Sequence, residues 1–263
     1  MLRVQKIKGL NVTHAVSPMK VPFDQNELAA ASIPGWRMLL SPGKNYYNED
    51  NGDLLNRISP LVPVSPRGEK MYQAVPSEFV NGKECLAFPD SGYTSIYDTG
   101  VEVNKTAWTV FAVVNLTPDT PHEIFTPHGE DIVDDTSYGL RVGFNNTGIF
   151  RIWRGDTSVR LAHGDGALYM DQLVYVMATY STNDGLRMYR NGVEVATSPD
   201  DKAPLTVSRF TLFGTALGTI STSGMNGQFG EMGVMDISLG EPENDSYRRA
   251  VDEWLMNKYS IGR

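Results

Sequence analysis

Short apolar segments alternate with turn sequences from about residue 80 onward, and this alternation restricts the fold more than any other feature of the chain. Its clearest unit is the segment 186–190, which is followed by Asn191-Gly192 and then by the segment 193–196. An Asn-Gly pair between two such segments favours a two-residue β-hairpin, because both residues adopt positive φ at low cost. The pattern predicts antiparallel strands over the C-terminal two thirds of the chain.

Other segments have the length and composition of strands. Residues 108–115 and 173–180 are apolar at nearly every position, which is typical of strands covered on both faces. The predicted strands are 84–88, 108–115, 139–144, 149–153, 173–180, 186–190, 193–196, 209–213 and 228–237. We therefore predict an all-β fold, built as an antiparallel β-sandwich.

One helix is predicted at the C-terminal end, over residues 245–258. Tyr247, Val251, Trp254 and Leu255 recur at the spacing of one helical face. An apolar face of this kind is expected to dock on the sandwich as part of the core.

Residues 1–80 differ from the rest because they contain eight prolines and few periodic segments. Frequent prolines exclude long helices and central strands. A short helix is expected near residues 26–31. We interpret residues 1–80 as a Pro-rich arm or an irregular layer, and residues 81–263 as the sandwich domain. The arm would make assembly contacts; the alternative is a cap on its own domain.

Composition limits the partners and the cellular location. The net charge of −8, with no run of Lys or Arg, argues against binding to nucleic acid or to anionic membranes. The single cysteine, Cys85, excludes an internal disulfide, and its apolar surroundings predict a buried, inert thiol. The first residues lack the apolar core of a signal peptide, and no stretch has the length of a membrane span.

Four segments resemble, in their order and spacing, the concanavalin A-like lectin/glucanase superfamily with its laminin G-like domains. They are the strand that begins at Trp108, the strand 173–180 with its polar turn, the Leu-Arg-Met-Tyr-Arg-Asn-Gly hairpin at 186–192, and the ending 227–261 with its Lys-Tyr-Ser-Ile tail. The Asn-Gly-Lys sequence at 81–83 is similar to the start of an early strand in such domains. The resemblance implies a concanavalin A-like jelly roll with a C-terminal helix.

This superfamily contains binding modules, glycosidases and virion proteins, so it implies a fold without a chemistry. Laminin G-like domains are frequent in phage capsid decoration proteins and tail-associated adhesins. We therefore expect a non-enzymatic phage virion protein, made in the host cytoplasm, whose partners are other virion proteins, copies of itself and a host surface glycan. The alternatives are a free carbohydrate-binding lectin and, less favoured, a glycan hydrolase or lyase.

No catalytic residues are predicted. Retaining glucanases of this fold carry Glu-x-Asp-x-x-Glu on one strand, which places two carboxyl groups about 5 Å apart. The sequence lacks such a run, and the strands expected to line a concave face carry Arg141, Arg151, Arg187 and Arg190 instead. His122 and His163 are expected to be loop residues or hydrogen-bonded polar groups, because no zinc-type histidine spacing is present.

Two sets of residues are candidates for binding. An acidic loop offers hard oxygen ligands of the kind that Ca²⁺ prefers, and its alternative role is a solvated acidic loop. Aromatic rings at strand ends or in loops are candidates for stacking on sugars, and their alternative role is in the core or an interface. The calcium candidates are Glu130, Asp131, Asp134 and Asp135, and the carbohydrate candidates are Trp36, Tyr138, Trp153 and Tyr169. No other cofactor is expected.

Overall fold

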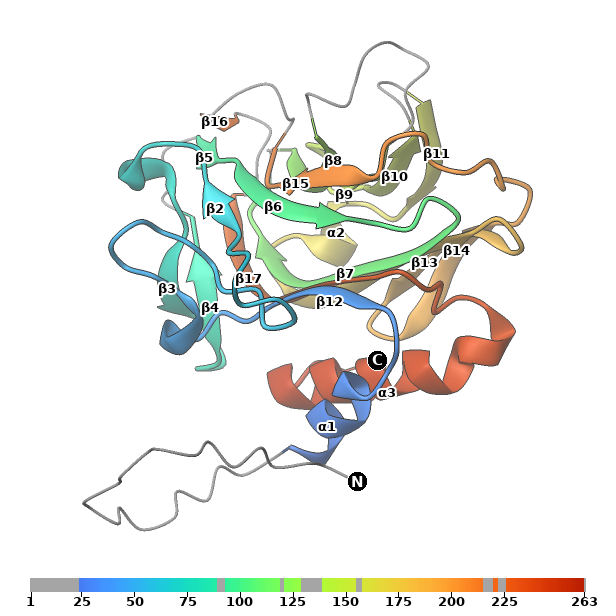
Figure 1. Cartoon of the computed structure of the whole chain (residues 1–263), viewed down its shortest axis with the longest axis horizontal. Coiled ribbons are helices and arrows are strands. Elements are labelled where there is room, and N and C mark those ends of the chain that lie inside the picture. The colour runs from blue at the N-terminus through green and yellow to red at the C-terminus, as the bar shows by residue number, and fades with distance from the viewer. Residues whose placement is uncertain are drawn as a thin grey trace.

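The computed structural model describes residues 24–88, 93–118, 121–128, 139–154, 158–214, 220–221 and 226–262. Two antiparallel sheets pack face to face as a β-sandwich, and the C-terminal helix lies on the outer side of the larger sheet (Figure 1). The predicted all-β jelly roll with a closing helix is confirmed.

The larger sheet has eight strands in the order β14-β13-β12-β7-β17-β4-β3, with β1 paired to β17. Their bounds are β1 Trp36–Leu40, β3 Val75–Glu78, β4 Glu84–Ala87, β7 Ala107–Leu116, β12 Leu173–Ser181, β13 Gly185–Arg190, β14 Val193–Ser198 and β17 Gly227–Met235. Its centre is the long pair β7 and β12, in which Val113 lies opposite Tyr175 and Val110 opposite Ala178. These two strands are buried almost throughout, as their continuous apolar sequences predict.

The smaller sheet has seven strands in the order β11-β10-β9-β8-β15-β6-β2. Their bounds are β2 Ser65–Pro66, β6 Tyr97–Glu102, β8 His122–Pro127, β9 Arg141–Phe144, β10 Phe150–Arg154, β11 Ser158–His163 and β15 Arg209–Leu212. A further short pair joins β5 (Thr94–Ser95) to β16 (Ile220–Ser221). The inner faces of the two sheets form one core that contains Phe144 and Phe150 from the smaller sheet and Trp108 and Tyr180 from the larger.

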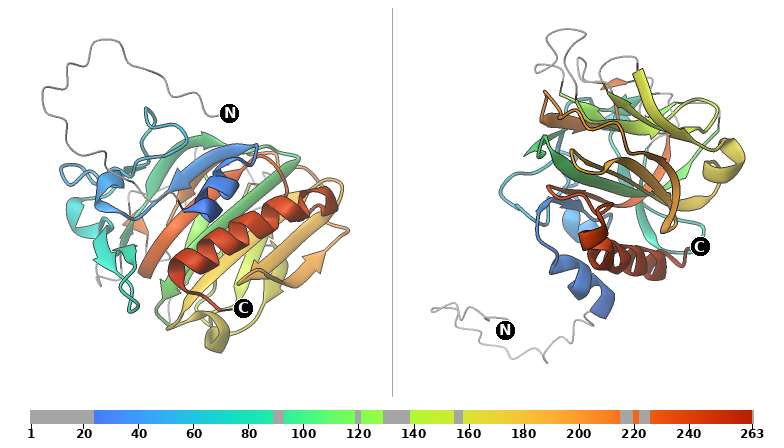
Figure 2. Two further views of the ribbon diagram at one scale, coloured as in Figure 1. Left: turned by 90° about the horizontal axis from the view of Figure 1, so that it is seen from below. Right: turned by 90° about the vertical axis from the view of Figure 1, so that its right-hand side faces the viewer.

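Within the described ranges, three α-helices accompany the sheets: α1 (Gln25–Ala31), α2 (Gly166–Tyr169) and α3 (Asp245–Tyr259). Figure 2 shows α3 lying across the larger sheet with α1 beside it. A second apolar cluster fills the space beneath α3, where Val251, Trp254 and Leu255 meet Phe111 and Tyr175 of the sheet. The predicted docking stripe is therefore confirmed at these three positions, while Tyr247 is exposed.

The strands and the helix predicted from residue 80 onward are confirmed. The hairpin turn has φ of 48° at Asn191 and 75° at Gly192, which are the two positive values that a type I′ turn requires. After residue 80, the strands β6, β8 and β11 of the smaller sheet were not predicted. Each mixes polar residues with few aliphatic ones, so the apolar signal is weak there.

The division at residue 80 needs correction. Strand β1 pairs in register with β17, so that Leu40 lies opposite Met232, and β3 pairs with β4 across the expected boundary. Prolines are tolerated here because Pro66 and Pro76 lie in strands at the edges of the two sheets. Residues 24–80 are thus an integral part of both sheets, while the rest of the expected arm lies outside the described residues.

Two further expectations concern the single cysteine and membrane-spanning segments. Cys85 is fully buried, and this burial raises the pKa of its thiol to about 11, in keeping with an inert cysteine. No helix within the described ranges is long and apolar enough to cross a membrane.

Candidate functional site

The outer faces of the two sheets differ in whether a helix covers them and in the side chains that point outward. Helix α3 covers the larger sheet, whereas in the described part of the chain no α-helix lies over the outer face of the smaller one. Side chains that alternate with core residues along β6, β8, β9, β10 and β15 point outward on this face. We call the outward group the polar face; its members are Arg67, Asp98, Glu123, Thr126, His128, Arg141, Arg151, Trp153 and Thr211.

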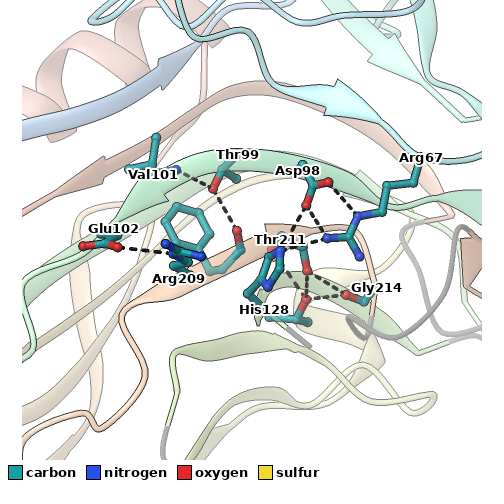
Figure 3. A network of polar contacts seen from close by, with 11 residues as sticks. Arg67, Asp98, Thr99, Val101, Glu102, His128, Arg209, Thr211 and Gly214 are labelled. Atoms are coloured by element: carbon teal, nitrogen blue, oxygen red, sulfur yellow. Dashed lines mark hydrogen bonds and ion pairs between the residues drawn. The ribbon is translucent and has the colours of Figure 1, made fainter. Parts of the chain in front are cut away.

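One end of the polar face is organised by Arg67, which follows β2 (Figure 3). Its Nε donates to Asp98 Oδ2 at 2.7 Å, and one Nη donates to His128 Nε2 at 2.9 Å. Since a guanidinium can only donate, His128 accepts through Nε2 and carries its proton on Nδ1 when neutral. That Nδ1 is buried and has no hydrogen-bond partner among the described residues.

The threonine pair beside this network has a positioning role. Thr211 lies opposite both Asp98 and Thr126 in the sheet, so the three side chains form one row. The two hydroxyls lie 2.8 Å apart, and both reach the carbonyl of Gly214 (Figure 3). Both threonines are fully buried, so this row holds the chain after β15 in place and is not itself free for a ligand.

The other end of the polar face contains an ion pair and an indole ring. Arg141 donates to Glu123 Oε1, and its guanidinium lies 5.0 Å from the ring centroid of Trp153. Glu123 is 4% exposed, and burial raises the pKa of its carboxyl although Arg141 opposes the shift. Glu123 Oε2 is buried and has no hydrogen-bond partner in the described part of the chain. Trp153 is half-buried, so part of its ring is accessible.

Arg151 lies beside this pair on the same face. Across the sheet it is opposite Gly143 on β9 and Ala162 on β11, and Gly143 is in turn opposite Glu123. A Cβ at Gly143 would come within 2.2 Å of the carbonyl oxygen of His122, so only glycine fits there. Arg151 is therefore flanked by two very small residues, and its buried Nε has no hydrogen-bond partner within the described ranges.

The carbohydrate candidates fall in different places. Trp153 lies on the polar face, whereas Trp36 packs edge-to-face on Phe111 and donates its indole N–H to the carbonyl of Ala30 at 3.1 Å. Tyr169 is 0% exposed, so its ring is inaccessible to a sugar and that part of the prediction is wrong. Its hydroxyl meets His163 Nδ1 at 2.7 Å.

The calcium candidates Glu130, Asp131, Asp134 and Asp135, together with Tyr138, lie outside the described residues, so calcium binding there stays a prediction. Within the described ranges no three His, Cys, Asp or Glu side chains gather closely enough to hold a metal ion.

The four arginines expected on one concave face are divided between the sheets. Arg141 and Arg151 lie on the polar face, but Arg187 and Arg190 belong to β13 of the larger sheet. Arg187 is bound there by Asp184 and Glu194. The expectation fails because the chain crosses from the smaller sheet to the larger one between β11 and β12, so β9 and β10 lie in one sheet and β13 in the other.

The two histidine predictions are confirmed. His122 accepts from the N–H of Asn226 and meets the carbonyl of Thr117 at 2.8 Å, so both ring nitrogens are bonded. Burial lowers the pKa of His122 to about 4.

Sequence reasoning missed Arg67, Asp98, Glu123 and His128 as members of one face. The alternating pattern could not have found it, because Glu123 and Thr126 are three positions apart and share a face only through the register shift between Glu123 and Phe125.

The fold and the polar face define a lectin-like jelly-roll protein. The sequence profile of the concanavalin A-like lectin/glucanases superfamily matches residues 88–243. The chain therefore belongs to this superfamily. A comparison with curated protein sequences gives no match.

Solved structures share the fold at low sequence identity. The Trypanosoma rangeli sialidase in complex with 2,3-difluorosialic acid is 13% identical with a TM-score of 0.52, and the match covers 85% of this chain and 33% of the sialidase. The binding domain of botulinum neurotoxin DC in complex with SialylT is 12% identical with a TM-score of 0.53, covering 87% of this chain and 52% of that one. The chain thus spans about a third of the sialidase and about half of the toxin domain.

A third structure matches over nearly its whole length. Domain 4 of an extracellular GH43 arabinanase from Geobacillus stearothermophilus, in complex with arabinotriose, is 13% identical with a TM-score of 0.50. The match covers 81% of this chain and 98% of that domain. At these identities the likeness shows the shared fold alone.

Proposed function

We propose that this protein is a non-catalytic glycan-binding protein and that the polar face is its binding surface. One observation carries the proposal: Arg151 and Trp153, both half-buried, lie two residues apart on this sheet face, and Arg151 has no ion pair or hydrogen bond within the described ranges. A partly buried polar group that is left unpaired costs about 1–3 kcal/mol. A polyhydroxylated ligand supplies both donors and acceptors, and the half-buried ring of Trp153 offers a surface for the apolar side of a sugar.

The arrangement of carboxylates supports binding without hydrolysis. Asp98 and Glu123 lie on β6 and β8 with β15 between them, so two strand spacings of about 4.8 Å separate them sideways alone. Glu123 is also three residues from Thr126, the residue on β8 that lies level with Asp98. Glycosidases hold their two carboxyl groups approximately 5–9.5 Å apart, so side chains that start from backbone positions this far apart are poorly placed to act as a pair. Each carboxylate is moreover bound by an arginine.

The solved structures with a similar fold are consistent with this proposal, since the arabinanase domain was solved with arabinotriose and the toxin domain with SialylT. The test is a screen of the full chain against immobilised bacterial polysaccharides and host-type glycans. We expect saturable binding, no release of reducing ends, and loss of binding in Trp153→Ala. Tyr247→Ala, an exposed aromatic on α3, is the matched control and should bind normally.

Binding that survives Trp153→Ala unchanged would contradict the assignment to the polar face. Absence of binding to every glycan would contradict the function itself, and turnover would contradict its non-catalytic character.

We further propose that the protein serves in a phage virion, as a capsid decoration or tail-associated protein. Exposed apolar side chains support an assembly role, because they concentrate in one part of the chain. Of the eleven large apolar side chains that are exposed within the described ranges, seven lie between residues 58 and 93. They are Ile58, Leu61, Val62, Met71, Val75, Val80 and Tyr93.

The assembly proposal is tested by mass spectrometry of purified virions and by light scattering of the isolated protein. We expect the chain in the particle, and we expect Leu61→Ser, at a side chain 95% exposed, to weaken incorporation or self-association. Val193→Ser, an exposed valine outside this region, should have no effect. Purified particles without the chain would contradict the virion role.

A further inference from the structure

Arg151 carries a positive charge that nothing in the described structure balances. Most arginines with described side chains have a carboxylate within 4 Å: Arg37, Arg57, Arg67, Arg141, Arg160, Arg187, Arg209, Arg248 and Arg249. Arg190 lacks one but donates to the carbonyl of Leu168 and to Gln172. Arg151 has neither an ion pair nor a hydrogen bond within the described ranges, although it is half-buried and its Nε is fully so.

The neighbours of Arg151 leave its guanidinium available. Gly143 and Ala162 flank it on β9 and β11, and neither has a side chain that could reach it. The nearest carboxylate in the same row, Glu123, lies two strands away and is bound by Arg141. A partly buried guanidinium is costly to leave unpaired, so a bound anion would stabilise it.

Trp153 lies close enough to Arg151 to contact the same ligand. It is two residues from Arg151 on β10 and therefore on the same face, about 6.6 Å along the strand. This spacing is similar to the width of one sugar ring, so a ring on the indole places a substituent over the guanidinium. Arg141 already lies near the indole and is neutralised by Glu123, so it adds little net charge.

We propose that the glycan bound at the polar face is acidic, with a sugar carboxylate received by Arg151 while its ring lies on Trp153. The inference rests on the proposed glycan-binding function and specifies its ligand class. A carboxylate is favoured over a neutral hydroxyl because it pairs with a guanidinium through two parallel charge-assisted hydrogen bonds. The chain as a whole carries a net charge of −8, which repels anions at a distance, so recognition depends on this local cation.

The experiment compares matched acidic and neutral probes on the full chain by isothermal titration calorimetry. The pairs are oligogalacturonate with its carboxyl-reduced product, and 3′-sialyllactose with lactose; a sulfated oligosaccharide serves as a third anion. We expect at least one acidic probe to bind about tenfold more tightly than its neutral partner, with the preference weakening as salt rises. Arg151→Gln should remove this preference, and Arg249→Gln, which removes an exposed charge from α3, should keep it.

Each outcome separates the two proposals. Equal affinity for the acidic and neutral members of both pairs would overturn the acidic-ligand inference while leaving glycan binding intact. A preference that persists in Arg151→Gln would overturn the assignment to this residue. Binding of the sulfated probe alone would contradict a carboxylate ligand. Absence of binding by every probe, together with a negative glycan screen, would overturn both proposals. Thermal unfolding of Arg151→Gln shows whether a loss of binding reflects misfolding. Arg151→Lys keeps the charge but lacks the planar guanidinium that pairs with a carboxylate through two hydrogen bonds, so it should restore only part of the preference for acidic probes.

Discussion

Two buried glutamates, one on the outer face of each sheet, show how differently the two faces are built. Beneath α3, Glu231 is fully buried, and its two oxygens are bound by Lys258 and by the hydroxyl of Tyr259. On the polar face, Glu123 is almost as deeply buried, but among the described residues only one of its oxygens has a partner. The two carboxylates thus differ in how their second oxygen is bound, although single buried atoms without a described partner, such as Trp254 Nε1, also occur beneath α3.

The side chains around the two glutamates also differ between the outer faces of the two sheets. The face under α3 is lined by aromatic and aliphatic side chains that pack on the helix, so it contributes to stability. The polar face is covered by none of the described α-helices and carries arginines, carboxylates and an accessible indole. Changes on the first face should alter the free energy of unfolding, and changes on the second should alter binding.

The largest effect is expected from removing the N-terminal strands. A chain of residues 81–263 loses β1 and β3 together with nine buried apolar residues: Ala30, Ile33, Met38, Leu39, Leu40, Leu54, Val64, Ala74 and Phe79. Their burial contributes more than about 10 kcal/mol, which is comparable with the whole stability of a domain. We expect the truncated chain to show no cooperative unfolding transition by circular dichroism. A sharp transition near that of the full chain would mean that residues 24–80 are dispensable after all.

A smaller loss of stability is expected at the centre of the α3 interface. Trp254 lies on the buried side of α3 and is 1% exposed. Trp254→Ala should therefore lower the free energy of unfolding by about 3–5 kcal/mol. Trp153→Ala on the polar face should change it by less than about 1 kcal/mol. Urea unfolding of the two variants measures the difference, and equal losses would contradict the distinction between the faces.

The acid sensitivity of the smaller sheet should depend on His122. Its folded pKa of about 4 lies below the unfolded value near 6.5, so the unfolded chain takes up the proton first. Its contribution is therefore fully present above pH 6.5 and is lost as the pH falls toward 4, at a cost of about 3 kcal/mol. His122→Gln should have a flatter pH dependence of stability over this window than the unaltered chain. Parallel curves for the two proteins would show that His122 is not the group responsible.

The sequence predicted the larger sheet better than the site. Strands such as β7 and β12 are apolar throughout, and the Asn191-Gly192 turn has its own local signal, so both could be recognised without tertiary information. The polar face could not, because Asp98, Glu123 and Arg151 come together only through the order of strands in a jelly roll. Trp153 was identified by its residue type alone. Residues 36–40 escaped detection as a strand because the prolines around them favoured an irregular interpretation.

Intrinsic tryptophan fluorescence tests most directly whether ligand binds on the polar face. Trp108 and Trp254 are buried, and Trp36 packs beneath the α1 region, so Trp153 is the indole that a ligand on this face would touch. Titration with a glycan identified in the screen should change the emission of the unaltered chain and of Trp36→Phe. The same titration should leave the emission of Trp153→Phe unchanged. A ligand-induced change that persists in Trp153→Phe and disappears in Trp36→Phe would place the ligand away from the polar face and contradict this assignment.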